Sequence, residues 1–136
     1  MKKHISYITR KESLSIAHKL YNPNFSHEKN LQIYDKCTNC HGHNFTLFVT
    51  IKDYIDEETG MVMNFKELKS IVRKEVYDKI DHKYLNEDIE EFKDNLMPTA
   101  ENMAMVIWQW LTPKLPNLFE VKLEETDNNS TIYRGE

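Results

Sequence analysis

The sequence lacks three features, and each absence excludes a class of protein. No apolar run approaches the roughly 20 residues that a membrane-spanning helix requires, so we expect no membrane partner. The basic start around Lys2 and Lys3 has no apolar stretch behind it, so no secretory signal is predicted. Lys and Arg number 18 against 22 Asp and Glu, which gives a net charge of −4. The chain therefore lacks the basic footprint of a nucleic-acid-binding protein, and we expect no nucleic-acid partner.

Cysteine is also scarce, and its pattern indicates a compartment. The only two cysteines, Cys37 and Cys40, stand in a Cys-x-x-Cys spacing. In a chain without a predicted secretory signal, this spacing favours thiol or metal chemistry over a disulfide scaffold. We therefore expect a protein of a reducing compartment, the cytoplasm.

The periodicity of the chain predicts the element order β-β-α-α-β-β. Alternating polarity indicates strands over residues 4–20, with a bulge or turn near residues 10–12, and over 41–54, 119–125 and 130–134. Helical spacing indicates one helix from the N-cap Asn64 to about Ile80 and a second after the N-cap Thr99, with Glu101 in its first turn. Residues 21–36 are expected to form a loop, and residues 83–97 are expected to be irregular.

This order predicts a single α+β domain over residues 1–136. The strands would form an antiparallel sheet with both helices on one face. A chain of 136 residues buries about two-thirds of its unfolded surface, which is enough for a core. So small a sheet leaves unpaired edges, and we therefore expect strand-to-strand assembly between subunits.

Three histidines occupy positions where the strand patterns call for apolar residues. His41 and His43 share the parity of the apolar residues in the strand over 41–54, and His18 holds an apolar position in the first strand region. One such residue is usually a satisfied polar group of the core. Three of them on one face form a set of neutral imidazoles that leaves a fourth position of a zinc ion open, which is the catalytic arrangement.

Glu125 also falls on the apolar phase, in the strand over residues 119–125. A buried carboxylate needs a partner that is rich in donors. The partner could be a guanidine-like ligand edge with two N–H groups, or an internal Lys or Arg.

Two further motifs have the residue types of acid–base chemistry. Cys37 lies just before His41, and beside a cation its pKa would fall, making it a thiolate base or nucleophile. It could also be an inert thiol or, with Cys40, a zinc ligand. Asp81 and His82 follow a predicted helix, where the macrodipole favours imidazolium and a carboxylate can orient the ring. This pair suits a general acid, although a solvated loop histidine is the alternative.

Together these motifs resemble the 6-pyruvoyl-tetrahydropterin synthase / 6-carboxytetrahydropterin synthase family over about residues 5–135. The matching segments are Ser15–Leu20, Lys36–Cys37, His41–Asn44, Thr59–Leu68, Asp81–Asn86, Pro98–Asn102, Glu125–Thr126 and Tyr133–Gly135. The resemblance implies a tunnelling fold (T-fold), in which the β-β-α-α-β-β subunits join their sheets into a barrel as trimers. Two trimers would stack as a hexamer, with active sites between subunits.

The resemblance also implies a lyase that acts on 7,8-dihydroneopterin triphosphate. It implies Zn²⁺ bound to His18, His41 and His43. Cys37 would be the base that abstracts a proton, with His82 and Asp81 as its relay partners, and Glu125 would anchor the pterin ring and belong to the same relay. Further substrate contacts are expected at Thr99 and Glu101, and, from proximity to these motifs, triphosphate contacts at Lys19, Lys36 and Lys83.

The spacing of Cys37 and His41 bears on the product. Three residues separate them, which is typical of the branch that forms 6-carboxy-5,6,7,8-tetrahydropterin and releases triphosphate and acetaldehyde, for queuosine-type bases. We predict that product. The alternative is the pyruvoyl-forming branch of tetrahydrobiopterin biosynthesis, which the long segment 21–36 and the tail 125–129 resemble. An alternative of another class is a non-catalytic zinc-binding or thiol-redox module built on Cys37 and Cys40.

Overall fold

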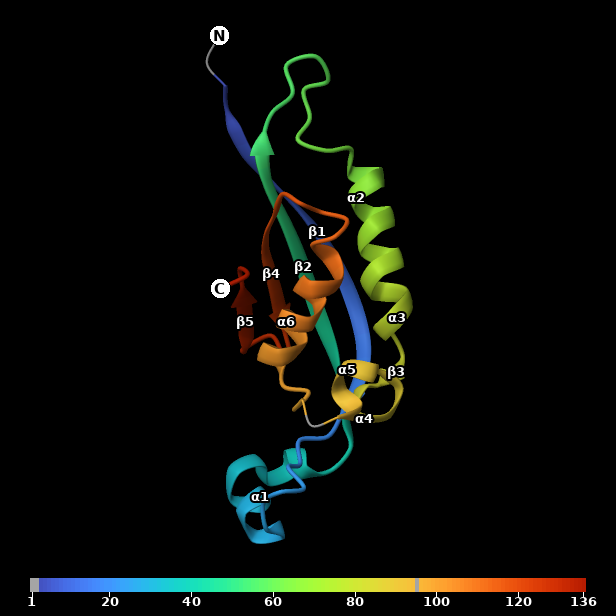
Figure 1. The fold of residues 1–136 in the computed structure, drawn as a ribbon, viewed down its shortest axis with the longest axis vertical. Helices are drawn as coiled ribbons and strands as arrows, with labels where there is room; N and C mark the ends of the chain where they lie inside the picture. Colours follow the sequence, from blue (N-terminus) through green and yellow to red (C-terminus); the bar gives the residue numbers. More distant parts are fainter. Residues whose placement is uncertain (1–2, 95) are drawn as a thin grey trace.

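A mixed β-sheet forms the frame of the protein (Figure 1). The computed structural model describes residues 3–94 and 96–136, so residues 1, 2 and 95 of the predicted domain lie outside the described residues. Within that part of the chain the sheet has the strand order β3-β1-β2-β4-β5. The strands are β1 (Ile5–His18), β2 (His41–Tyr54), β3 (Lys83–Tyr84), β4 (Leu118–Glu124) and β5 (Ser130–Tyr133).

Helices cover one face of this sheet (Figure 1), which confirms the predicted α+β class. Both predicted N-caps form: the Asn64 side chain accepts from the Lys66 amide, and the Thr99 hydroxyl accepts from the Asn102 amide. The helix that was predicted to begin after Asn64 includes a π-helical segment. The helical elements are α1 (His27–Tyr34), η1 (Asp35–Thr38), α2 (Phe65–Val72), η2 (Arg73–Tyr77, π-helical), α3 (Asp78–Ile80), α4 (Leu85–Asp88), α5 (Glu90–Lys93) and α6 (Ala100–Leu111).

The long antiparallel pair β1–β2 corrects one prediction. Its register runs without a shift from Ile5↔Tyr54 to His18↔His41, so the bulge or turn expected near residues 10–12 is wrong. Glu12 lies on the buried face, 4% exposed, where two arginine side chains satisfy its carboxylate. The apparent change of phase arises because the apolar residues Ile5 and Tyr7 lie on the exposed face while the polar Glu12 lies on the buried one.

Two segments expected to be irregular contain short regular elements. Helix α1 and the 3₁₀ turn η1 lie in and beside the segment 21–36 that was predicted as a loop. Strand β3 and the short helices α4 and α5 lie within 83–97. Because β3 pairs with β1 in parallel, at Ile16↔Lys83, the sheet is not purely antiparallel as predicted.

The hydrophobic core lies between the inner face of the sheet and helices α2 and α6. Alternate residues of β1, β2 and β4 are buried there, as period-two patterns require. None of the helices that the structure describes combines the length and apolar character that a membrane crossing requires. The fully buried side chains include Leu14, Phe45, Leu47, Ile51, Leu68, Met103, Ile107, Leu111 and Leu123.

Candidate active site

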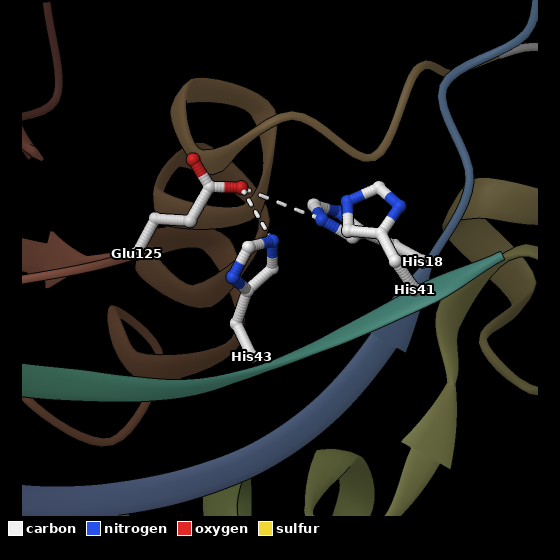
Figure 2. Close-up of side chains that lie close together, drawn as sticks. All are labelled: His18, His41, His43 and Glu125. Carbon is white, nitrogen blue, oxygen red and sulfur yellow. Dashed lines mark ion pairs between the residues drawn. The ribbon is translucent and has the colours of Figure 1, made fainter. Parts of the chain in front are cut away.

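Two strand ends bring the three predicted histidines together. His18 is the last residue of β1 and pairs with His41, the first residue of β2. His43 lies two residues further along β2, so its side chain points to the same face as that of His41. The ring centroids lie 4.5 Å apart for His18 and His41, and 5.0 Å apart for His41 and His43. Figure 2 shows the three rings facing Glu125, which follows directly after β4.

Two of the three rings, those of His18 and His41, are oriented by hydrogen bonds to backbone carbonyls. His18 Nδ1 lies 2.7 Å from the Pro98 carbonyl oxygen, and His41 Nδ1 lies 2.7 Å from that of Asn39. A carbonyl oxygen only accepts, so each Nδ1 is the donor, and in the neutral ring Nε2 keeps its lone pair. Burial lowers the pKa of His18 and outweighs the opposing effect of the Pro98 hydrogen bond, which favours the neutral ring.

The free nitrogen atoms converge on one point. Nε2 of His18, of His41 and of His43 is buried and has no hydrogen-bond partner among the described residues. Glu125 Oε1 lies 3.4 Å from Nε2 of both His18 and His43 (Figure 2). The four ligand atoms all lie within 4.8 Å of one another.

This donor set fits a divalent metal ion. Unprotonated imidazole nitrogens and a carboxylate oxygen repel one another at such distances unless a cation lies between them. Imidazole nitrogen and carboxylate oxygen are also ligands that Zn²⁺ accepts. The carbonyl oxygens of Pro98 and Asn39 accept hydrogen bonds from His18 and His41, and such bonds usually orient histidines that bind a metal. These two residues could not be predicted from the sequence, because every residue carries a backbone carbonyl.

Cys37 lies in η1, half-buried, with its backbone carbonyl accepting a 2.7 Å hydrogen bond from the Leu20 amide. Burial raises the pKa of Cys37, and the carboxylates of Glu125 and Asp35 raise it further. Cys40 is exposed. Among the described residues the candidate metal group contains no cysteine, so the alternative zinc site on Cys37 and Cys40 has no support.

Asp81 and His82 form the predicted pair. His82 Nδ1 lies 2.7 Å from Asp81 Oδ2, while Asp81 Oδ1 accepts a 2.9 Å hydrogen bond from the Ser15 amide. Burial pushes the pKa of Asp81 upward, but the hydrogen bonds from the Ser15 amide and His82 Nδ1 oppose it, and the pKa lies below its ordinary value. The His82 ring is 79% exposed. In the described part of the chain, no hydrogen bond or ion pair joins this pair to the histidine cluster.

The predicted substrate contacts divide between two hollows and the open surface. Glu101 and Glu125 line one hollow of about 290 Å³. Lys19 lines a second hollow, of about 280 Å³, which Pro98 connects to the histidine cluster. Thr99 caps α6 at the edge of the first hollow. Lys36 and Lys83 are exposed and line neither hollow.

Comparisons with known proteins agree over nearly the whole chain. Residues 7–136 match the sequence profile of the family described as 6-pyruvoyl tetrahydropterin synthase. A relative from Dictyostelium discoideum, named 6-pyruvoyl tetrahydrobiopterin synthase, is 48% identical over 130 residues, which cover 95% of this chain and 96% of the relative. The human protein of the same name is 42% identical over 133 residues, which cover 95% of this chain and 91% of the human protein. The solved structure of Caenorhabditis elegans 6-pyruvoyl tetrahydropterin synthase superposes with a TM-score of 0.92 at 32% identity, covering 100% of both chains.

These findings confirm the predicted fold family and favour the pyruvoyl alternative over the predicted carboxy product. The relatives carry the pyruvoyl name, although Cys37 and His41 have the spacing that is typical of the other branch. That spacing is the length of a connection between two elements. Connections change in length among relatives more readily than the residues of a site change. The chain belongs to the 6-pyruvoyl tetrahydropterin synthase family and is an enzyme of the lyase class.

Proposed function

We propose that this enzyme eliminates triphosphate from 7,8-dihydroneopterin triphosphate and forms 6-pyruvoyl tetrahydropterin. The observation that carries the proposal is the convergence of three buried imidazole nitrogens, none of which has a hydrogen-bond partner among the described residues, in a member of this family. His18, His41 and His43 would hold a zinc ion, which when bound polarises oxygen atoms of the substrate side chain and acidifies the adjoining C–H groups. The pyruvoyl names of the relatives support this product.

Glu125 is proposed to orient the pterin. Its carboxylate can accept two parallel hydrogen bonds from the guanidine-like edge of the ring, as it would from arginine. Glu125 and Glu101 line the same hollow, which supports a donor-rich ligand there. Thr99, at the start of α6, is proposed as a further contact. Lys19, Lys36 and Lys83 remain proposed contacts of the triphosphate, and the position of Lys19 in the neighbouring hollow supports it best.

Cys37 is proposed as the base that removes a proton from the side chain of the substrate. The electron pair of that C–H bond shifts along the side chain as the C–O bond to triphosphate breaks, and triphosphate leaves with the electrons. Tautomerisation of the resulting enol turns the carbinol next to the departed triphosphate into a carbonyl and the terminal carbon into a methyl group. Further proton shifts oxidise the other carbinol to a carbonyl while the dihydropterin ring is reduced to the tetrahydro level. The electrons balance within one molecule, so no external oxidant or reductant is required.

His82 is proposed to return a proton, with Asp81 holding its Nδ1–H so that Nε2 is free for transfer. Its ring is 79% exposed and makes no hydrogen bond or ion pair with the histidine cluster of its own subunit among the described residues. This position supports a site that a second subunit completes. The two free cysteines support a reducing compartment such as the cytoplasm.

Incubation of the zinc-loaded protein with 7,8-dihydroneopterin triphosphate tests the proposal. Mass spectrometry of the products should show 6-pyruvoyl tetrahydropterin and triphosphate without acetaldehyde. The Cys37→Ala variant should keep its zinc and lose turnover. Release of acetaldehyde with a carboxylated pterin would replace the proposed product, and a failure to consume the substrate would refute the proposed reaction.

A further inference from the structure

A short segment, residues 81–86, runs beside the end of β1 and pairs with its edge. At the start of this segment, Asp81 Oδ1 accepts from the Ser15 amide at 2.9 Å, and the His82 amide donates to the Ser15 carbonyl at 2.7 Å. Strand β3 then pairs with β1 in parallel at the next two positions. The described pairing of β3 with β1 ends at Ala17, because the chain turns into α4 directly after β3.

The side chain of Asn86 continues this pairing beyond the end of β3. Its Oδ1 accepts from the Lys19 amide at 2.8 Å, and its Nδ2 donates to the Lys19 carbonyl at 2.8 Å. A carboxamide offers the same donor and acceptor as a peptide group, so Asn86 binds Lys19 as a neighbouring strand would. Both residues are half-buried, so water competes with these two bonds less than it would at the open surface.

Asn86 is itself anchored by the short helix α4. Leu85, the residue before it, is fully buried in the core. The Asp88 carboxylate accepts from the Tyr84 amide at 2.9 Å, and the Ile89 amide donates to the Leu85 carbonyl at 3.3 Å. These contacts hold the backbone on both sides of Asn86, so its carboxamide projects from an anchored turn.

The residues on either side of Lys19 belong to the candidate active site or bind it. His18 precedes Lys19 and is the buried histidine of the cluster. Leu20 follows Lys19, and the Leu20 amide donates to the Cys37 carbonyl at 2.7 Å. A peptide group is planar, so the Lys19 amide lies in one plane with the His18 carbonyl, and the Lys19 carbonyl lies in one plane with the Leu20 amide. One side chain, that of Asn86, therefore holds both peptide planes between the histidine and the residue that binds Cys37.

We propose that Asn86 is a positioning residue for His18 and Cys37. Through the Lys19 amide it fixes the backbone of the zinc ligand, and through the Lys19 carbonyl it fixes the peptide group that binds the turn carrying the thiol. The catalytic consequence rests on the proposed function, in which His18 binds zinc and Cys37 removes a proton. The proposed proton-donating pair lies at the other end of the segment 81–86, so one edge of β1 connects all three parts of the site. Asn86 does not need to touch the substrate.

The first test compares Asn86→Ala, which removes both hydrogen bonds to Lys19, with Asn117→Ala. Asn117 is also half-buried, and its Nδ2 also binds a strand residue, Asp53, at 3.3 Å, but it lies at the opposite end of β2 from the histidines. In Asn86→Ala the Kd for zinc should rise about tenfold, as it does when a residue that orients a metal ligand is lost. The visible absorption bands of the protein loaded with Co²⁺ should also change, because they depend on the geometry of the ligands. Asn117→Ala should match the wild type in both measurements.

The second test follows the position of Cys37. In a Cys40→Ser background Cys37 is the only thiol, and its alkylation by iodoacetamide in the folded protein should become severalfold faster in Asn86→Ala, since the turn around it loses a support. The kcat of the zinc-loaded protein should fall about tenfold. Asn86→Asp keeps the acceptor for the Lys19 amide and loses the donor to the Lys19 carbonyl. It should therefore recover most of the zinc affinity that Asn86→Ala loses, while the alkylation of Cys37 stays fast.

The outcomes separate this proposal from the proposed function. If Asn86→Ala keeps the wild-type Kd for zinc and the wild-type alkylation rate, or if Asn117→Ala changes both as much, the positioning role is overturned and the proposed reaction stands. Should Asn86→Ala fail to fold, Asn86→Asp decides: the proposal requires fast alkylation with nearly normal zinc affinity, and a parallel change in both would overturn it. If the wild type does not consume the substrate, the proposed function fails, and the zinc and alkylation measurements still decide whether Asn86 holds His18 and Cys37.

Discussion

At the scale of the residue, the site depends on which nitrogen of each imidazole faces its neighbours. The carbonyls of Pro98 and Asn39 hold the Nδ1 protons of His18 and His41, and so they turn both Nε2 lone pairs inward. Sequence parity predicted that the three histidines share one face, because side chains alternate along a strand. The tautomers were not predictable, since they depend on two carbonyls in segments without strand or helix periodicity.

His43→Ala is the substitution that tests the metal site with the least damage to the core. The His43 ring is 25% exposed, whereas His18 is fully buried. Removal of the His43 ring therefore leaves a smaller cavity than removal of the His18 ring. We expect zinc to fall from about one equivalent per chain to a small fraction, because the loss of one of three imidazoles removes a ligand of the ion. Metal analysis after gel filtration measures this. His27→Ala, which removes an exposed histidine of α1, should retain its zinc, and full retention in His43→Ala would refute the site.

At the scale of the element, the long strands and the two main helices were predictable from periodicity and caps. The structure of the segment before Cys37 was not predictable in this way, because the turn-forming residues Asn22, Pro23 and Asn30 suggested a loop. Asn30 is instead buried in α1. Its Oδ1 accepts from the Asn22 amide at 2.7 Å, and its Nδ2 donates to the carbonyls of Asn22 and Ser26 at 2.9 and 3.1 Å. A side chain that binds the backbone of its own segment from the inside gives no periodic signal.

Asn30→Asp tests whether this segment fixes Cys37. The change keeps the shape of the side chain but replaces the Nδ2 donor by an oxygen that faces carbonyl oxygens, and an unpaired buried charge of this kind costs about 2 kcal/mol or more. Hydrogen exchange should accelerate across residues 22–38, and turnover should fall while zinc content stays unchanged. Gln32→Glu, which adds the same charge at an exposed position of α1, is the control. Unaltered exchange in Asn30→Asp would contradict the role assigned to Asn30.

At the scale of the whole molecule, the sheet has one covered face and one open face. Lys52 lies between the rings of Tyr7 and Phe119 on the open face, and Lys11 and Lys122 lie over Phe48. Strand β5 ends the sheet on one side, and β3 pairs with only two residues of β1 on the other. The free edges of β5 and of most of β1 offer unpaired backbone groups to another chain, which supports the predicted assembly of sheets between subunits into a hexamer.

Ile132→Lys tests that assembly. Ile132 lies on β5 and is 51% exposed; its partner in register is Lys122, whose side chain lies on the open face. A lysine there would repel Lys122 and the neighbouring cations, and charged edge residues are a common means of preventing strand-to-strand association. Gel filtration with light scattering should show the mass of a hexamer for the wild type and a smaller species for the variant. Turnover should fall with the mass, since we propose that a second subunit completes the site. Ile33→Lys removes an isoleucine that is 52% exposed on α1, away from the sheet edge, and should remain assembled. A hexamer that survives Ile132→Lys would show that β5 does not form the contact between subunits.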